Sequence, residues 1–232
     1  MLPKIELTEN IDIFHFSPLL RGMKFAISYG DTEGGIGLTA TGAMNRKFVH
    51  WAAVHFEWPE YGVEELYSVN KVLNELDFPP LGVVRDMNQH FRLMRRQRDK
   101  LLPTKNGRAF LAQPQIFFDR IAHTYLFNYI EVGETQHDMR ERMQVWDFYL
   151  NTINALADEG FKLQTLKREL GILSVEDDPR DWRIDSELGI NVLRPLCWLG
   201  LLRLEKDGIW TWRERSFRRT PLWKACLKLA TD

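Results

Sequence analysis

A few residues of this chain stand at spacings that could support catalysis. The run Gly35-Ile36-Gly37-Leu38-Thr39-Ala40 fits the GxGxxA pattern of dinucleotide-binding loops, and Glu57 follows about twenty residues later. That fingerprint also requires a preceding strand within a parallel βαβ unit. Here the sequence predicts an amphipathic helix before the run and another helix after it. We therefore interpret the glycine-rich run as a loop.

The remaining chemical groups are dispersed. Six histidines occur, and His50 and His55 are five residues apart, about 140° around a helix, which does not suit a shared metal. Carboxylate pairs such as Glu64-Glu65 and Asp177-Asp178 lie in polar runs. No GK[ST], GxSxG or HExxH motif is present. The sequence predicts a non-enzymatic protein with no cofactor and no metal.

The composition is that of a folded protein. The 232 residues suit one large domain or two small ones, and 44% of them are hydrophobic. No run approaches the roughly 20 apolar residues that cross a bilayer, and the N-terminus lacks a signal-peptide pattern. Two cysteines, Cys197 and Cys226, cannot build a disulfide framework. We expect a cytoplasmic protein that does not contact membranes.

Charge is strongly segregated although the net charge is only -1. Residues 85–108 carry eight Lys/Arg against Asp86 and Asp99, a local charge of +6. Residues 203–228 carry eight Lys/Arg against Glu205, Asp207 and Glu214, a local charge of +5, which leaves -12 for the rest of the chain. Such segregation can attract a polyanion, but it can equally serve an acidic partner or a solvated surface.

The first basic segment has a distinctive order of predicted elements. Pro80 begins a helix, and two short strands, 91–96 and 101–104, flank the polar turn 97–100. Earlier helices are predicted from Ser17-Pro18 to about Tyr29, from Thr41 to before Pro59, and through residues 66–76. Three helices followed by a two-stranded hairpin is the order of a winged helix.

The second half repeats this plan. A helix of about residues 186–199 precedes strands 201–205 and 209–212, which flank Lys206-Asp207-Gly208, a strong turn signal. Pro195 falls inside that helix, where a proline costs about 3 kcal/mol or more unless the helix kinks. The predicted domains are 1–132, an N-terminal helical and winged-helix-like module, and 133–232, a long helix with a second such module. The fold class is α+β, mainly α: two winged-helix-like modules joined by a helical middle, in tandem.

Two short runs carry a resemblance to a known family. Gly37-Leu38-Thr39-Ala40-Thr41-Gly42-Ala43-Met44 and Leu102-Pro103-Thr104-Lys105-Asn106-Gly107-Arg108-Ala109-Phe110-Leu111 are similar to the opening LTxxGxL and closing LTxxGRxLL of a bacterial group. That group consists of uncharacterised proteins named after an open reading frame of a root-inducing plasmid. The resemblance covers about residues 17–130, and Pro103 departs from the pattern. It implies the winged-helix fold and a link to mobile elements, but no activity.

The leading functional hypothesis is DNA binding, in a regulatory role. A helix-turn-helix protein places its last helix in the major groove, and a wing can add phosphate contacts. The predicted nucleic-acid-binding residues lie on the third helix, in the wing and in the second module: Arg85, Gln89, Arg92, Arg95, Arg96, Arg98, Lys100, Asn191 and Arg194. The alternative is a protein-protein interaction module whose basic wings dock an acidic protein partner without nucleic acid.

Overall fold

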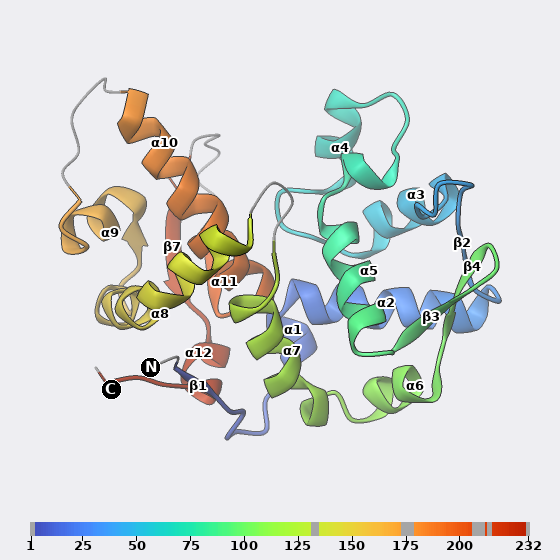
Figure 1. Cartoon of the computed structure of the whole chain (residues 1–232), viewed down its shortest axis with the longest axis horizontal. Helices are drawn as coiled ribbons and strands as arrows, with labels where there is room; N and C mark the ends of the chain where they lie inside the picture. The colour runs from blue at the N-terminus through green and yellow to red at the C-terminus, as the bar shows by residue number, and fades with distance from the viewer. Residues whose placement is uncertain (1–2, 131–134, 173–178, 206–211, 213–214, 231–232) are drawn as a thin grey trace. The chain divides into compact units, whose positions relative to one another are not determined.

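The structure is a computed structural model that describes residues 3–130, 135–172, 179–205, 212 and 215–230. The chain forms two compact units, an N-terminal unit of Ile13–Ile121 and a C-terminal unit made of Met1–Asp12 and Ala122–Asp232. Both are mainly helical with small antiparallel sheets (Figure 1). This confirms the predicted α+β class. Among the described residues, no helix has the length and apolar character needed to cross a bilayer.

The N-terminal unit is built from helices and one three-stranded sheet. Its elements are α1 (Ile13–Phe16), α2 (Pro18–Thr32), β2 (Ile36–Gly37), α3 (Arg46–His55), α4 (Val63–Val69), η1 (Glu75–Asp77), α5 (Pro80–His90), β3 (Met94–Gln97), β4 (Lys100–Pro103), α6 (Lys105–Ala112) and most of α7 (Gln115–Phe127). Ser17 caps α2 as predicted, accepting the Leu20 N–H at 3.2 Å. The prediction that the next helix begins at Thr41 is wrong, because the Asn45 side chain accepts the Phe48 N–H and caps α3.

The sheet of this unit has the strand order β2-β4-β3. The hairpin aligns Met94 with Pro103 and Arg96 with Leu101, and Leu101 also pairs with Ile36 of β2. Pro103 is accommodated because it occupies the last position of its strand, where a missing N–H is tolerated. The short strand after the first long helix thus pairs with the second strand of the later hairpin.

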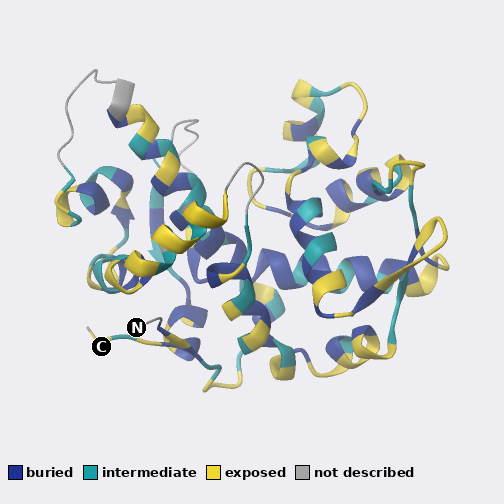
Figure 2. Cartoon of the chain, in the orientation of Figure 1, coloured by how far each residue is buried: buried dark blue, intermediate teal, exposed yellow. Residues whose placement is uncertain are grey.

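An aromatic core holds the helices of the N-terminal unit together. Phe48, Phe56 and Phe78 are fully buried, and the Phe56 ring centroid lies 6.2 Å from that of Phe48 and 6.3 Å from that of Phe78. Gly22 allows α2 to approach its neighbours, since an added Cβ would lie 2.9 Å from the Trp58 ring and 3.0 Å from Val84. Figure 2 shows buried faces on α2 and α5 and an exposed β3–β4 hairpin.

The C-terminal unit resembles the first in having a long helix, a short strand, a helical region and a hairpin in this order. It contains β1 (Lys4–Ile5), the end of α7, α8 (Gln136–Leu156), β5 (Phe161–Lys162), α9 (Leu163–Glu169), α10 (Pro179–Leu188), η2 (Gly189–Leu193), α11 (Arg194–Leu199), β6 (Leu202–Glu205), β7 (Ser216–Arg219), α12 (Pro221–Cys226) and β8 (Leu227–Lys228). Its three-stranded sheet has the order β5-β7-β6, in which the strand before α9 again pairs with the second hairpin strand.

Two details of this unit differ from the sequence prediction. The strand that pairs with Leu202–Glu205 is Ser216–Arg219; the predicted turn 206–208 and residues 209–211 of the predicted second strand lie outside the described residues. The predicted helix of 186–199 is not continuous, because a π-helical turn, η2, precedes Pro195. This turn lets the Arg194 N–H bond to the Gly189 carbonyl, five residues back, and it accommodates the proline.

The ends of the described chain meet within the C-terminal unit. Lys4 of β1 pairs with Lys228 of β8, and Ile5 pairs with Leu227. The first twelve residues therefore belong structurally to this unit, whereas the sequence placed them with the first module and set the boundary at 132. Such a two-residue pairing leaves no periodic pattern in the sequence.

A buried ion cluster joins α9 to α10. The Lys167 side chain is fully buried, and its Nζ donates to Asp181 and, at 2.6 Å, to Asp185. A buried ammonium group is tolerated only with such partners, because removing it from water is costly. This cluster fixes the second and third helices of the module relative to each other.

A second polar network closes the C-terminal sheet. Arg219 is nearly buried and donates to Asn154 and Asp158, and the Trp223 indole N–H donates to Asn154 at 2.8 Å. The hydrogen bond from Arg219, assisted by its charge and that of Lys224, lowers the pKa of Asp158 below its ordinary value.

We expect Arg219→Gln to return the pKa of Asp158 toward that of a free aspartate. Because the pKa is lowered in the folded state, this carboxylate stabilises the fold above the unfolded pKa, and the contribution is lost as the pH falls through the folded pKa. An NMR titration of the Asp158 carboxyl measures the shift. Lys224→Gln, which removes a more distant cation at 3.7 Å, should have a smaller effect. An ordinary pKa in the unaltered protein would contradict this assignment.

Candidate nucleic-acid interface

The predicted site residue Arg85 is held inside the N-terminal unit. Its Nη1 lies 2.7 Å from Oε1 of Glu75, and its side chain is 29% exposed. Glu75 is itself buried and also accepts the Met44 N–H at 2.6 Å. Arg85 therefore neutralises a buried carboxylate that ties η1 to α3 and α5. Its place on α5 gives it a structural partner that the sequence did not indicate.

The C-terminal end of α5 presents two other predicted residues. Gln89 is exposed in the last turn, and the helix ends at His90. We expected Arg92 to lie on the face of this helix. It lies beyond the helix end instead, in a left-handed conformation with φ +53°. The next N–H, of Leu93, bonds back to the Asn88 carbonyl at 2.8 Å, which closes a Schellman-type helix end. Glycine normally occupies the left-handed position of this motif.

The hairpin β3–β4 carries four predicted cations, all of them exposed: Arg95, Arg96, Arg98 and Lys100. Three of them donate hydrogen bonds to neutral oxygens. Arg95 donates to the Gln97 side chain at 3.2 Å, Arg96 to the Arg98 carbonyl at 3.2 Å and Lys100 to the Gly34 carbonyl at 3.1 Å. Within the described part of the chain, none of these cations, nor Arg92, forms an ion pair with a carboxylate. Their charge is therefore uncompensated at short range.

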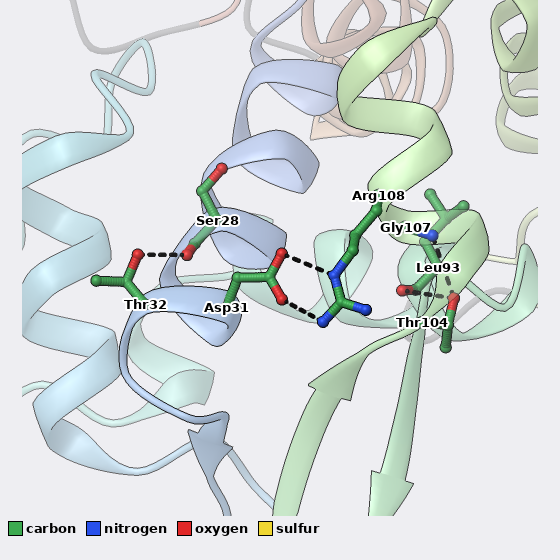
Figure 3. Close-up of polar contacts among 7 residues, drawn as sticks. All are labelled: Ser28, Asp31, Thr32, Leu93, Thr104, Gly107 and Arg108. Atoms are coloured by element: carbon green, nitrogen blue, oxygen red, sulfur yellow. Dashed lines mark hydrogen bonds and ion pairs between the residues drawn. The ribbon is translucent and has the colours of Figure 1, made fainter.

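The hydroxyl of Thr104 fastens the hairpin to the helices on either side of it. It donates to the Arg92 carbonyl at 2.7 Å. It also lies 3.2 Å from the Leu93 carbonyl and accepts the Gly107 N–H at 3.1 Å (Figure 3). The Thr104 N–H also donates to Leu93, at 3.0 Å. We call this set of bonds the threonine clasp. It joins the end of α5, the end of β4 and the start of α6.

Two further residues of the closing motif complete this region. Gly107 packs so closely on the Leu93 carbonyl that an added Cβ would lie 2.3 Å from the oxygen. Arg108 forms a two-point contact with Asp31 at 2.8 and 3.4 Å (Figure 3), and this hydrogen-bonded pair raises the pKa of Arg108. The Thr-x-x-Gly-Arg run is thus explained by structure: it caps a helix, packs on a carbonyl and binds α2.

The C-terminal unit contains the same clasp. Gly200 adopts φ +88° at the end of α11, and the Leu201 N–H bonds back to Leu196 at 2.8 Å. The Thr220 hydroxyl donates to the Gly200 carbonyl at 2.5 Å, and its N–H donates to Leu201 at 3.0 Å. The two units therefore share their hydrogen bonding as well as their strand order. Arg92 stands where the second unit has a glycine.

The predicted residues of the second unit lie in a different setting. Asn191 is in the π-helical turn, and Arg194, half-buried, stacks over the Trp198 ring at 5.0 Å. On the hairpin, Arg203 and Arg218 both reach Glu205, at 3.7 and 2.8 Å. Together with the Arg219–Asp158 pair, these contacts give each of the three arginines on β6 and β7 a carboxylate partner, with Glu205 shared between two of them. The sequence count of +5 did not reveal this pairing.

An open depression lies at the base of the first hairpin. Its volume is about 420 Å³, and its walls come from the end of α5, from β3 and from the first turn of α6: Gln89, Arg92, Met94, Arg95, Thr104, Lys105 and Asn106. The structure thus brings together three predicted residues, Gln89, Arg92 and Arg95. Lys105 and Asn106 were not predicted as site residues, although Lys105 contributes to the local +6. Their position in the sequence, directly after the helix cap Thr104, was the signal that could have identified them as site residues.

These features define a two-domain, mainly helical α+β protein. The chain belongs to the Y4jL family: the Y4jL N-terminal domain matches residues 15–116 and the y4jL C-terminal domain matches residues 135–221, each within one structural unit. It is 47% identical over 230 residues to the "Uncharacterized protein y4jL" of Sinorhizobium fredii, covering 99% of this chain and 96% of that protein. The resemblance seen in the sequence is confirmed in part: the chain belongs to an uncharacterised bacterial family, which is the Y4jL family. No solved structure matches the chain.

We expect Gly107→Ala to lower the free energy of unfolding by about 2 kcal/mol, because backbone rather than a movable side chain blocks the new methyl group. Denaturant unfolding measures the change. Gly82→Ala is the matched control: this helical glycine has open space around it, so alanine should stabilise by about 0.5–1 kcal/mol. Equal effects of the two substitutions would rule out the close packing on Leu93.

Replacing Arg92 by glycine should increase the free energy of unfolding by up to about 1 kcal/mol, since the left-handed conformation is unfavourable for arginine. The reciprocal change Gly200→Ala, at φ +88°, should lower it by about 1 kcal/mol. Both changes in the free energy of unfolding are measured from the midpoints of denaturant unfolding curves. A loss of stability in Arg92→Gly would show that the arginine side chain is needed for folding.

Proposed function

We propose that both units are winged-helix modules and that the N-terminal one binds duplex DNA. The order of elements supports the first part. In each unit a long helix, a short strand, a helical region and a hairpin follow one another, and the short strand pairs with the second hairpin strand. In this reading α5 is the recognition helix and β3–β4 is the wing.

One observation carries the functional proposal. Five exposed cations, at the end of α5 and along the hairpin, lack a carboxylate partner among the described residues: Arg92, Arg95, Arg96, Arg98 and Lys100. Surface cations that are paired within the protein gain little from a phosphate, because the existing partner must first be displaced. Unpaired cations release counterions when they meet a phosphate backbone, which drives association at low salt. The second hairpin, with its pairs to Glu205 and Asp158, lacks this property among its described residues.

A role in protein interaction is favoured by a separate observation. Val69 and Leu76, between α3 and α5, are 82% and 91% exposed, and Val72 is 49% exposed. Several large apolar side chains that are exposed close together in the sequence are typical of surfaces that contact other proteins. In this second candidate function, the basic wing docks an acidic protein and no nucleic acid binds.

The DNA proposal is tested by fluorescence anisotropy with a labelled duplex over a series of salt concentrations. We expect log K to fall linearly with log salt, by about 0.9 for each phosphate neutralised. Arg95→Glu with Arg98→Glu should abolish this binding and lower the melting temperature by no more than a few degrees, since both side chains are exposed.

The matched control changes the same net charge in the other unit. Arg168→Glu with Arg183→Glu alters side chains that are 74% and 80% exposed on α9 and α10. Binding should persist in this control. An equal loss in both double variants would place the DNA contact elsewhere, and no binding by the unaltered protein at low salt would refute the proposal in favour of an acidic protein partner.

A further inference from the structure

The depression at the base of the first hairpin has the chemistry of an anion site. Three of its seven lining residues are cations, Arg92, Arg95 and Lys105, and two carry amide groups, Gln89 and Asn106. No carboxylate lines it. Arg92, Arg95 and Lys105 come from three different elements, the end of α5, β3 and the first position of α6. Cations brought together without an acid repel one another, so their convergence favours a ligand that carries negative charge.

The backbone beneath this depression is fixed in an unfavourable conformation. Arg92 keeps φ +53° at a position where the second unit has Gly200. The threonine clasp holds this conformation through the Arg92 carbonyl, at 2.7 Å from the Thr104 hydroxyl. Strained backbone held by its surroundings is found preferentially at binding sites. An arginine at a position whose backbone favours glycine points to a use for the guanidinium.

We propose that the depression binds one backbone phosphate of the DNA strand, and that Arg92, Arg95 and Lys105 share this single phosphodiester. Guanidinium groups suit this role because their planar fork matches phosphate oxygens. The volume of about 420 Å³ lies in the range of small-ligand sites, so the phosphate can enter together with an adjoining sugar. This inference rests on the proposed DNA binding and specifies where the backbone is anchored.

A double-mutant cycle tests whether the phosphate is shared. Arg92→Gly and Lys105→Gln are each made alone and then together, and duplex affinity is measured by anisotropy over a salt series. Each single change should weaken binding about tenfold. If one phosphate is shared, the double variant should lose far less than a hundredfold, and the salt slope should fall by no more than about 0.9. Neither change should lower the melting temperature, because Arg92→Gly relieves strain and Lys105 is exposed.

The control is Lys71→Gln, an exposed lysine of the same unit that does not line the depression, and it should leave affinity and slope unchanged. Additive losses with a slope reduced by about 1.8 would show two independent phosphates and overturn the shared site. Unchanged binding in the Arg92 and Lys105 variants would overturn it while leaving DNA binding intact. Absence of binding by the unaltered protein would refute the proposed function itself.

A free nucleotide could offer the same phosphate chemistry, so adenosine monophosphate is added as a competitor. We expect millimolar concentrations of it to leave the labelled duplex bound, since a single phosphate cannot replace the contacts of the whole wing. Displacement of the duplex by the nucleotide, lost in Arg92→Gly, would overturn the proposal and assign the depression to a small phosphorylated ligand.

Discussion

The hydroxyl of Thr104 connects the three parts of the N-terminal unit on which the candidate interface depends. It binds the last carbonyls after α5, stands at the end of the hairpin, and caps α6 through Gly107. A hydroxyl can do this because it donates one hydrogen bond and accepts others. This anchor adds to the backbone bonds from Thr104 to Leu93 and from Leu93 to Asn88, which also join the hairpin to α5. The connection fixes the backbone beside Arg92 and Lys105, two of the exposed cations at the site.

The same bonds recur at Thr220, so the two units share one mechanism of closure. They differ in how their surface charge is used. Among the described residues, Arg95 and Arg96 of the N-terminal hairpin bond to neutral oxygens, whereas Arg218 and Arg219 of the C-terminal unit bond to Glu205 and Asp158. We infer that the two units share one scaffold but differ in surface charge, and that the surface of the N-terminal unit suits a polyanion.

Much of this architecture was predictable from local signals. The Ser17-Pro18 start of α2, the start of α5 at Pro80, the hairpin around residues 97–100 and the long α8 all follow from caps, prolines and periodicity. The features that the sequence did not indicate depend on distant partners. Two-residue strands β1 and β8 have no period, and the strand partner of β6 lies beyond a strong local turn signal. Local propensity cannot indicate which of two later segments a strand will join.

The candidate site shows the same division. Counting charges located the basic hairpin, but it could not show that Arg85 is bound to the buried Glu75, nor that Arg92 leaves the helix in a left-handed conformation. Both depend on tertiary contacts. Lys105 and Asn106 became part of the site only because the threonine clasp folds α6 back beside β3.

The most direct test of this division of surfaces is an NMR titration of the full chain with an unlabelled DNA duplex. We expect the largest amide shift changes at the end of α5, along β3–β4 and at the start of α6, with little change in β6 and β7. Changes confined to the C-terminal hairpin, or the absence of any saturable change at low salt, would contradict the assignment of DNA binding to the N-terminal unit.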